Sequence, residues 1–262
     1  MRNARLAIPL LAAISIGIAA PRAAAQDLTL DRATQMLRSN SHDEVMTAIQ
    51  SLGMLGSPRA VEPLAARIRD GLAPDLLESA IDTLTVLGRP EAGPVLYELT
   101  SHRRPEVRLR AVQAIAATRP RGAERALVSA LSDSSAEVRG AAAIAIGELG
   151  ATGAIDSLFL AFDRGVPEAG PALGRLARPE HVGRVLDYLG RVSFSQMSAV
   201  LGELLARREL PARARLDVIA RLGELATPEV RTFLESWIES QQPPANDPVR
   251  RAAEDVIARI AQ

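Results

Sequence analysis

Residues 136–150 decide the fold, and they read Ala-Glu-Val-Arg-Gly-Ala-Ala-Ala-Ile-Ala-Ile-Gly-Glu-Leu-Gly. From Val138 to Ile146 the apolar residues stand at offsets of 0, 4, 7 and 8, which is the spacing of one buried stripe along an α-helix. The Leu-Gly pair that ends at Gly150 is typical of a helix C-terminus, because glycine readily adopts the left-handed conformation that closes a helix. The stretch therefore predicts one amphipathic helix whose buried face is rich in alanine.

The same pattern recurs through much of the chain at a step of 30 to 32 residues. The most clearly marked copies share a Val-Arg pair, as at Val107-Arg108, Val138-Arg139 and Val249-Arg250. All copies keep the apolar offsets of a helix stripe, and they begin at Val45, Leu77, Val107, Val138, Ala169 and Val249. Internal repetition of this period is typical of solenoid proteins.

A second helix is predicted after each of these copies. In several repeats a proline marks its opening, where the missing N–H has no intrahelical partner to lose. These openings are Ser57-Pro58, Arg89-Pro90, Arg119-Pro120, Arg178-Pro179 and Thr227-Pro228. Each unit is a helical hairpin too small to bury its own apolar faces, so it must stack on its neighbours. We predict an all-α fold, a right-handed α/α superhelix of antiparallel helix pairs with repeats of about 31 residues.

Breaks in the pattern divide this solenoid, which is expected to occupy residues 26–262. The register is lost between Leu189 and Pro211, where one additional helix is predicted over about Ser195 to Arg208. The predicted parts are a capping helix at 28–39, regular repeats at 42–190, an irregular extra helix at 191–210 and terminal repeats at 211–262.

The first 25 residues have the layout of a secretory signal. Arg2 and Arg5 give a positive start, and residues 6–20 are apolar apart from one serine. Ala23-Ala24-Ala25 then offers the small residues that a signal peptidase requires. An uncleaved anchor is the alternative, but about 15 apolar residues fall short of the roughly 20 that span a bilayer. We predict cleavage after Ala25 and a bacterial product that is exported, periplasmic or extracellular, without a membrane span.

Two stretches resemble HEAT repeats of the short phycobilisome-lyase-like subtype. They are residues 136–150, quoted above, and residues 51–64, which read Ser-Leu-Gly-Met-Leu-Gly-Ser-Pro-Arg-Ala-Val-Glu-Pro-Leu. The resemblance covers nearly all of residues 42–262 and implies an α/α superhelix that serves as a scaffold for protein binding. Relatives that attach or isomerise bilins act on cytoplasmic pigment proteins, and a chain with an export signal departs from that. The family has no general catalytic motif, so the resemblance identifies no active residues.

Composition excludes several kinds of chemistry. The sequence has no cysteine, and all 31 of its basic residues are arginine. Disulfides, thiolate catalysis, sulfur-ligated zinc and catalytic lysines are therefore impossible. His42, His102 and His181 are too far apart in sequence for a local metal-binding pattern, and no nucleotide-binding or hydrolase motif occurs. We expect no cofactor, no metal site and no enzyme activity.

One charged segment, residues 103–125, stands out because it holds seven arginines against two glutamates, directly after the mainly acidic residues 62–98. Guanidinium groups suit carboxylate or phosphate recognition. Arg108 shares the repeat position of Arg139 and is expected to be structural. The candidate binding residues of this basic section are Arg103, Arg104, Arg110, Arg121 and Arg125. The alternative is that the acidic and basic sections pair with each other inside the solenoid.

An aromatic pair, Phe233 and Trp237, is a second candidate for binding, with core packing as the alternative. The favoured function is a non-enzymatic exported scaffold or adaptor that binds a protein partner of unknown identity along the ridge of its second helices. The alternative is an anion-binding module in which Arg103–Arg125 holds a phosphate-bearing envelope polymer or a lipid headgroup. A lyase or isomerase is a third candidate by family resemblance alone. Nucleic acid is a poor candidate because the chain has an export signal, no lysine and few aromatic residues.

Overall fold

The computed structural model of this chain describes residues 29–260. The predicted signal peptide, residues 1–25, lies outside the described residues. Within residues 29–260 every regular element is an α-helix or a 3₁₀ turn, which confirms the predicted all-α class. None of the helices in this range is both long and apolar enough to cross a membrane.

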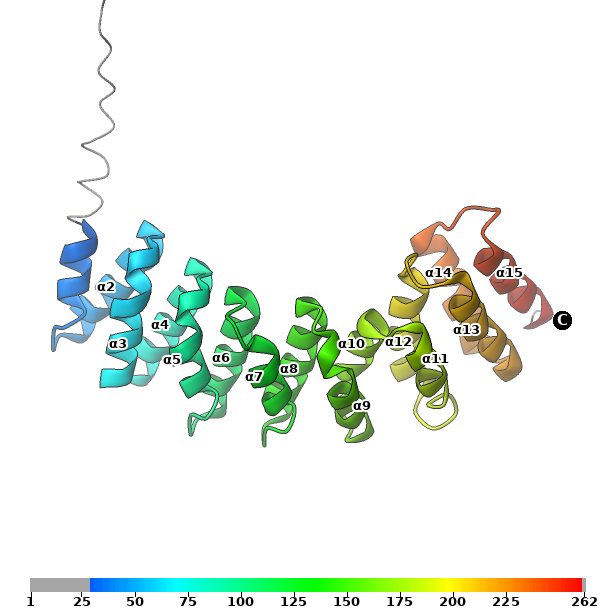
Figure 1. Cartoon of the computed structure of the whole chain (residues 1–262), viewed down its shortest axis with the longest axis horizontal. Helices are drawn as coiled ribbons and strands as arrows, with labels where there is room; N and C mark the ends of the chain where they lie inside the picture. Colours follow the sequence, from blue (N-terminus) through cyan, green and yellow to red (C-terminus); the bar gives the residue numbers. More distant parts are fainter. Residues whose placement is uncertain (1–28, 261–262) are drawn as a thin grey trace, which may run out of the picture.

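The helices stack side by side in two layers that form one curved row (Figure 1). The first-helix layer holds the helix that opens each repeat: α2 (His42–Leu55), α4 (Pro74–Leu87), α6 (Pro105–Thr118), α8 (Ala136–Leu149), α10 (Ala169–Leu176) and α12 (Phe194–Ala206). The second-helix layer holds α3 (Val61–Asp70), α5 (Gly93–Leu99), α7 (Ala123–Ala130), α9 (Ile155–Asp163) and α11 (Pro179–Leu186). Each first helix packs on the next from α2 through α12, which is the sequential stacking of an α/α superhelix.

Residues 29–36 form a short helix at the N-terminal end of the stack, within the range predicted for a capping helix. Its apolar side bears Leu30 and Ala33, which are buried together with Leu37. Its other side is exposed, as a helix at the end of a solenoid requires.

Left-handed residues close the first helices and turn the chain towards the second layer. Gly56, Gly88 and Gly150 follow α2, α4 and α8 with φ values of 61°, 62° and 70°. Arg119 takes the same place after α6 with φ 47°, a conformation that is uncommon for a residue with a side chain. Three of the turns continue as 3₁₀ segments, at Pro58–Ala60, Pro90–Ala92 and Thr152–Ala154.

Small residues set the distance between neighbouring first helices. Ala142 and Ala145 of α8 are buried, as the helix stripe predicts. The approach is closer still between α10 and α12, where a Cβ added at Gly174 would overlap the backbone carbonyl oxygen of Val200. Because that oxygen belongs to the backbone of a packed helix, only glycine fits at position 174 without a shift of α12.

The order of the two layers is exchanged after α12, the helix for which the sequence loses its register. α13 (Ala212–Leu225) follows α12 directly and contacts α11 and α15 (Pro248–Ile260) as well as α12. α14 (Pro228–Gln241) contacts α12, α13 and α15. α15 bears the Val249-Arg250 pair of a first helix, yet through α13 it continues the second-helix layer. The reason is that α12 has no second helix to pair with. Helices α13 to α15 therefore lie in the layers opposite to those that their order in the repeat predicts.

Candidate functional site

Two arginines of the basic section pair with the acidic helix before it. Arg104 donates to Glu78 of α4 at 2.9 Å, and Arg110 donates to Asp82 at 2.8 Å and to Glu78 at 3.3 Å. These half-exposed contacts join α6 to α4, and each is worth about 0.2–1 kcal/mol. For Arg104 and Arg110 the structure thus shows internal pairing between the acidic and basic sections.

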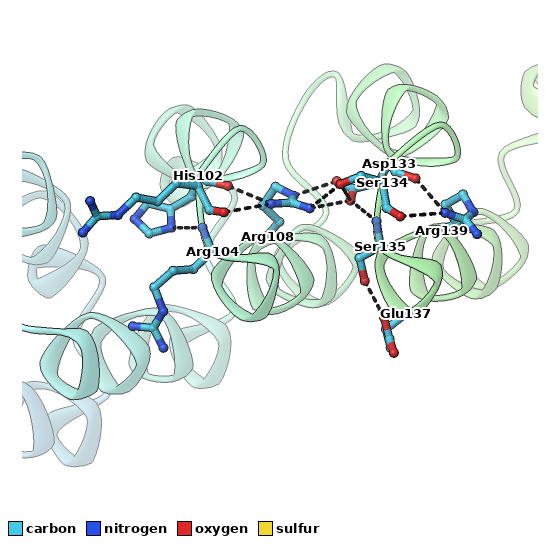
Figure 2. Close-up of polar contacts among 9 residues, drawn as sticks. His102, Arg104, Arg108, Asp133, Ser134, Ser135, Glu137 and Arg139 are labelled. Atoms are coloured by element: carbon cyan, nitrogen blue, oxygen red, sulfur yellow. Dashed lines mark hydrogen bonds and ion pairs between the residues drawn. The ribbon is translucent and has the colours of Figure 1, made fainter.

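Arg108 has a different and more deeply buried role. Its Nη1 donates to the His102 carbonyl oxygen at 3.0 Å, and its other two nitrogens bind the Asp133 carboxylate (Figure 2). These hydrogen bonds from Arg108 hold the pKa of Asp133 below its usual range. Arg139 donates likewise to the Asp133 carbonyl oxygen at 2.8 Å, and Arg250 to the Pro243 carbonyl oxygen at 2.8 Å. The arginine of the Val-Arg pair therefore fastens the turn before its own helix.

The other three candidates, Arg103, Arg121 and Arg125, are exposed, and no ion pair joins them to another described residue. Arg103 lies in the turn before α6, whereas Arg121 lies in the turn after it and Arg125 on α7. α6 has 14 residues and so separates its two ends by about 21 Å. The five candidate residues thus fall into three groups, and the structure does not bring them together in one patch.

Each of the three histidines makes a hydrogen bond at the start of a helix. His42 Nε2 lies 2.6 Å from Asp75 Oδ2, and this hydrogen bond raises the pKa of His42 above its ordinary value. His102 Nδ1 accepts the backbone N–H of Arg104, and His181 Nδ1 accepts that of Arg178, both at 3.1 Å. In the described range no group of His, Asp and Glu side chains is placed to hold a metal ion.

Exposed apolar side chains are a feature that sequence reasoning missed. Met54 of α2 and Val86 of α4 are 83% and 77% exposed, and Ile144 of α8 is 45% exposed. Met54 and Val86 each stand two residues before the glycine that closes the helix. The repeated Leu-Gly signal marked these positions in the sequence, but without the packing of the layers their exposure was not evident.

The aromatic pair on α14 divides into two environments. Trp237 is buried, as core packing requires. Phe233 is partly exposed and meets the ring of Phe194 on α12 edge to face, with ring centroids 5.9 Å apart. Both aromatic residues of α14 line a cavity between α12 and α14.

The fold and these contacts define a class of protein, the α-solenoid of stacked helical hairpins. Residues 92–169 match the family model of HEAT repeats, and residues 46–70 match that of the PBS lyase HEAT-like repeat. The chain therefore contains HEAT repeats, as its sequence pattern predicts. No curated protein matches it significantly.

Several known structures are similar to this chain at low sequence identity. The complex of CpcE and CpcF of phycocyanin lyase from Nostoc sp. is 18% identical over 96% of this chain and 100% of that chain, with a TM-score of 0.47. Human deoxyhypusine hydroxylase is 19% identical over 92% and 98%, with a TM-score of 0.45. A homology model of the full-length AP-3 complex is 14% identical over 88% and 50%, with a TM-score of 0.56. These are likenesses of fold alone.

Proposed function

We propose that this chain is an exported, non-enzymatic scaffold that binds a protein partner along its first-helix layer. The supporting observation is the set of exposed apolar side chains there, Met54, Val86 and Ile144. Met54 and Val86 occupy equivalent places near the ends of α2 and α4, and Ile144 lies about one turn further from the end of α8. Because the helices that carry them are packed, this surface needs no ordering before it binds. Burial of this apolar area against a partner supplies affinity, and the surrounding charges steer its orientation.

The proposed contact surface differs from the one that the sequence analysis favours. It lies on the first-helix layer and not along the ridge of the second helices. Among the described residues of the second helices, only Leu160 of α9 is a large apolar side chain of comparable exposure, at 48%. The exposed apolar groups therefore favour the opposite layer as the contact surface.

An anion-binding module is the second candidate function, and the exposed arginines near the C-terminal end of α6 are its best-supported contacts. There Arg121 and Arg125 are exposed and form no ion pair with another described residue. Vesicles that contain phosphatidylglycerol are a suitable probe. Binding that weakens steeply with salt and is lost in an Arg121→Glu/Arg125→Glu variant would favour this candidate over the scaffold.

A lyase or isomerase is the third candidate, supported by the match of residues 46–70 to the PBS lyase HEAT-like repeat. Turnover that is abolished by replacement of a single acidic residue or histidine would be its test.

Site-specific crosslinking in cells tests the scaffold. A photoreactive phenylalanine analogue replaces Val86 in one copy and Leu160 in a matched copy, because both positions are exposed and lie on opposite layers. A protein captured from Val86 and not from Leu160 supports binding by the first helices. Capture from Leu160 alone assigns the surface to the second helices, and capture from neither overturns the proposal. N-terminal sequencing of the same protein tests the export signal, with Gln26 expected as the first residue.

A further inference from the structure

An open groove runs between α12 and α14, at the place where the order of the layers is exchanged. Two adjoining cavities, of about 320 and 470 Å³, share Ser198, Phe233 and Ser236 in their walls. The residues that line them on α12 extend from Phe194 to Ala206, so the groove follows about 18 Å of that helix.

The two walls of the groove differ in character. On α12 the wall bears the small residues Ser198, Gly202 and Ala206, which recur four residues apart on one side of the helix. Phe194 and Glu203 of α12 also line the groove. On α14 the wall consists largely of aromatic surface, from Phe233 and Trp237. The Phe233 ring reaches across to Phe194 of α12, so the groove is an open channel along the line where the two helices meet, and a chain can lie along it.

The groove is open even though both helices are held firmly from outside. α12 packs closely on α10 through Gly174 and Val200, and α14 packs on α15. Within the groove, a Cβ at Gly202 would have Phe233 as its nearest neighbour, 4.0 Å away. The indole Nε1 of Trp237 is buried and finds no acceptor among the described residues. This interface is therefore not packed for stability alone.

The charge of the groove is acidic. Glu203 and Glu229 are the charged residues that line it, and no arginine does so. Glu203 accepts from Arg175 of α10 at 2.7 Å, which leaves Glu229 at the start of α14 with its charge directed to solvent. Hydrogen bonds from its own backbone N–H and from Thr227 lower the pKa of Glu229, so this carboxylate is ionised at neutral pH.

We propose that this groove binds an extended segment of the protein partner, in which a large apolar or aromatic side chain stands next to an arginine or lysine. At about 3.3 Å per residue, roughly 18 Å of groove accommodates five or six extended residues. The apolar side chain packs on the exposed face of Phe233 within the groove, and the basic group meets Glu229 at the mouth. This inference rests on the proposed scaffold function and adds the position of a binding site and the chemistry of its partner.

Selection from a random dodecapeptide library displayed on phage, with the purified full-length protein as bait, tests the proposal. Two matched variants separate groove occupancy from folding. Gly202→Gln fills the groove, whereas Gly183→Gln adds the same side chain at an open helical position of α11, where a Cβ meets nothing within 4 Å. Glu229→Arg reverses the charge at the mouth of the groove. Its matched control is Glu180→Arg, which makes the same charge change in the first turn of α11, outside the groove.

The expected result is a set of peptides that combine a basic residue with a neighbouring aromatic or large aliphatic residue. Their affinity, measured by fluorescence polarisation, falls by about tenfold or more in Gly202→Gln and Glu229→Arg and is unchanged in the two control variants. No enrichment, an acidic consensus, or binding that survives Gly202→Gln overturns the groove. If crosslinking at Val86 still captures a partner in that case, the scaffold function stands and only the groove is wrong.

Discussion

Arg108 and Asp133 form a bidentate ion pair between α6 and the turn that precedes α8. Arg108 Nε donates to Asp133 Oδ2 at 2.8 Å and Nη2 donates to Oδ1 at 2.7 Å, with side chains 12% and 10% exposed. Asp133 Oδ1 also accepts the backbone N–H of Ser135 at 2.8 Å, at the start of α8. One carboxylate therefore joins two successive repeats and orders the entry to the second of them (Figure 2).

Removal of that carboxylate is predicted to be costly. Asp133→Ala leaves the Arg108 guanidinium largely buried without its partner and the Ser135 N–H without an acceptor. We expect a loss of about 2–3 kcal/mol in the free energy of unfolding. Urea denaturation followed by circular dichroism measures it, and Asp255→Ala, on the exposed face of α15, is the control with no expected change. A loss no larger than that of the control would show that the pair contributes little.

The same pair predicts acid sensitivity. Because Arg108 lowers the pKa of folded Asp133, the pair stabilises the protein above the unfolded pKa of about 3.9 and is lost as pH falls through the lower folded value. The difference in stability between the parent and Asp133→Asn should therefore be constant near neutral pH and shrink below about pH 4. A difference that stays constant in acid would contradict this assignment.

His42 and Asp75 predict the opposite dependence on pH. Asp75 raises the pKa of folded His42, so this contact stabilises the protein below the unfolded pKa of about 6.5 and is lost as pH rises through the higher folded value. In an NMR titration the His42 ring should titrate above about pH 6.5, and Asp75→Asn should return it towards that value. An unchanged His42 titration in Asp75→Asn would refute the pairing.

The close approach of α10 and α12 predicts that Gly174 tolerates no side chain. A Cβ there meets the Val200 carbonyl oxygen and Glu203 Cβ, so Gly174→Ala should lower the free energy of unfolding by about 1–3 kcal/mol despite alanine's better helix propensity. Gly183→Ala, in an open helical position, should instead stabilise by about 0.5–1 kcal/mol. Thermal denaturation of the two variants tests both signs, and stabilisation by Gly174→Ala would show that α12 can move away.

The alanine-rich face of α8 yields a prediction from the sequence stripe itself. Ala145 is buried, so Ala145→Phe should overpack the contact between first helices and cost about 1–3 kcal/mol. Ala117 of α6 is exposed, and Ala117→Phe should leave the midpoint of thermal unfolding nearly unchanged. Equal melting of parent and Ala145→Phe would mean that this face is not part of the core.

Part of this protein could be predicted from sequence because its signals are local. A helix stripe such as Val138 to Ile146 specifies which face is buried, and the Leu-Gly pairs specify where the chain reverses. The position of Arg108 after a stripe valine likewise predicted its structural role. Each of these features depends on residues within about one or two helical turns, so the periodicity of the sequence is enough to predict it.

The candidate site could not be predicted to the same degree, because it depends on which ends and faces of helices meet. Arg103 and Arg121 are 18 positions apart in sequence, but they lie at opposite ends of α6. Conversely, Phe194 and Phe233 are in contact across 39 positions. Charge counted along a segment does not show how a 14-residue helix separates its two ends.

The sequence by itself determined that this chain is a stack of helical hairpins, with alanine-rich first helices and glycine-closed turns. Only the tertiary structure decided which arginines pair internally, which apolar side chains remain exposed, and that α12 exchanges the two layers and opens a groove against α14. The physical reason is that hydrophobic periodicity encodes the buried face of each helix locally. Surface sites depend instead on how closely helices that are not adjacent in sequence pack against one another.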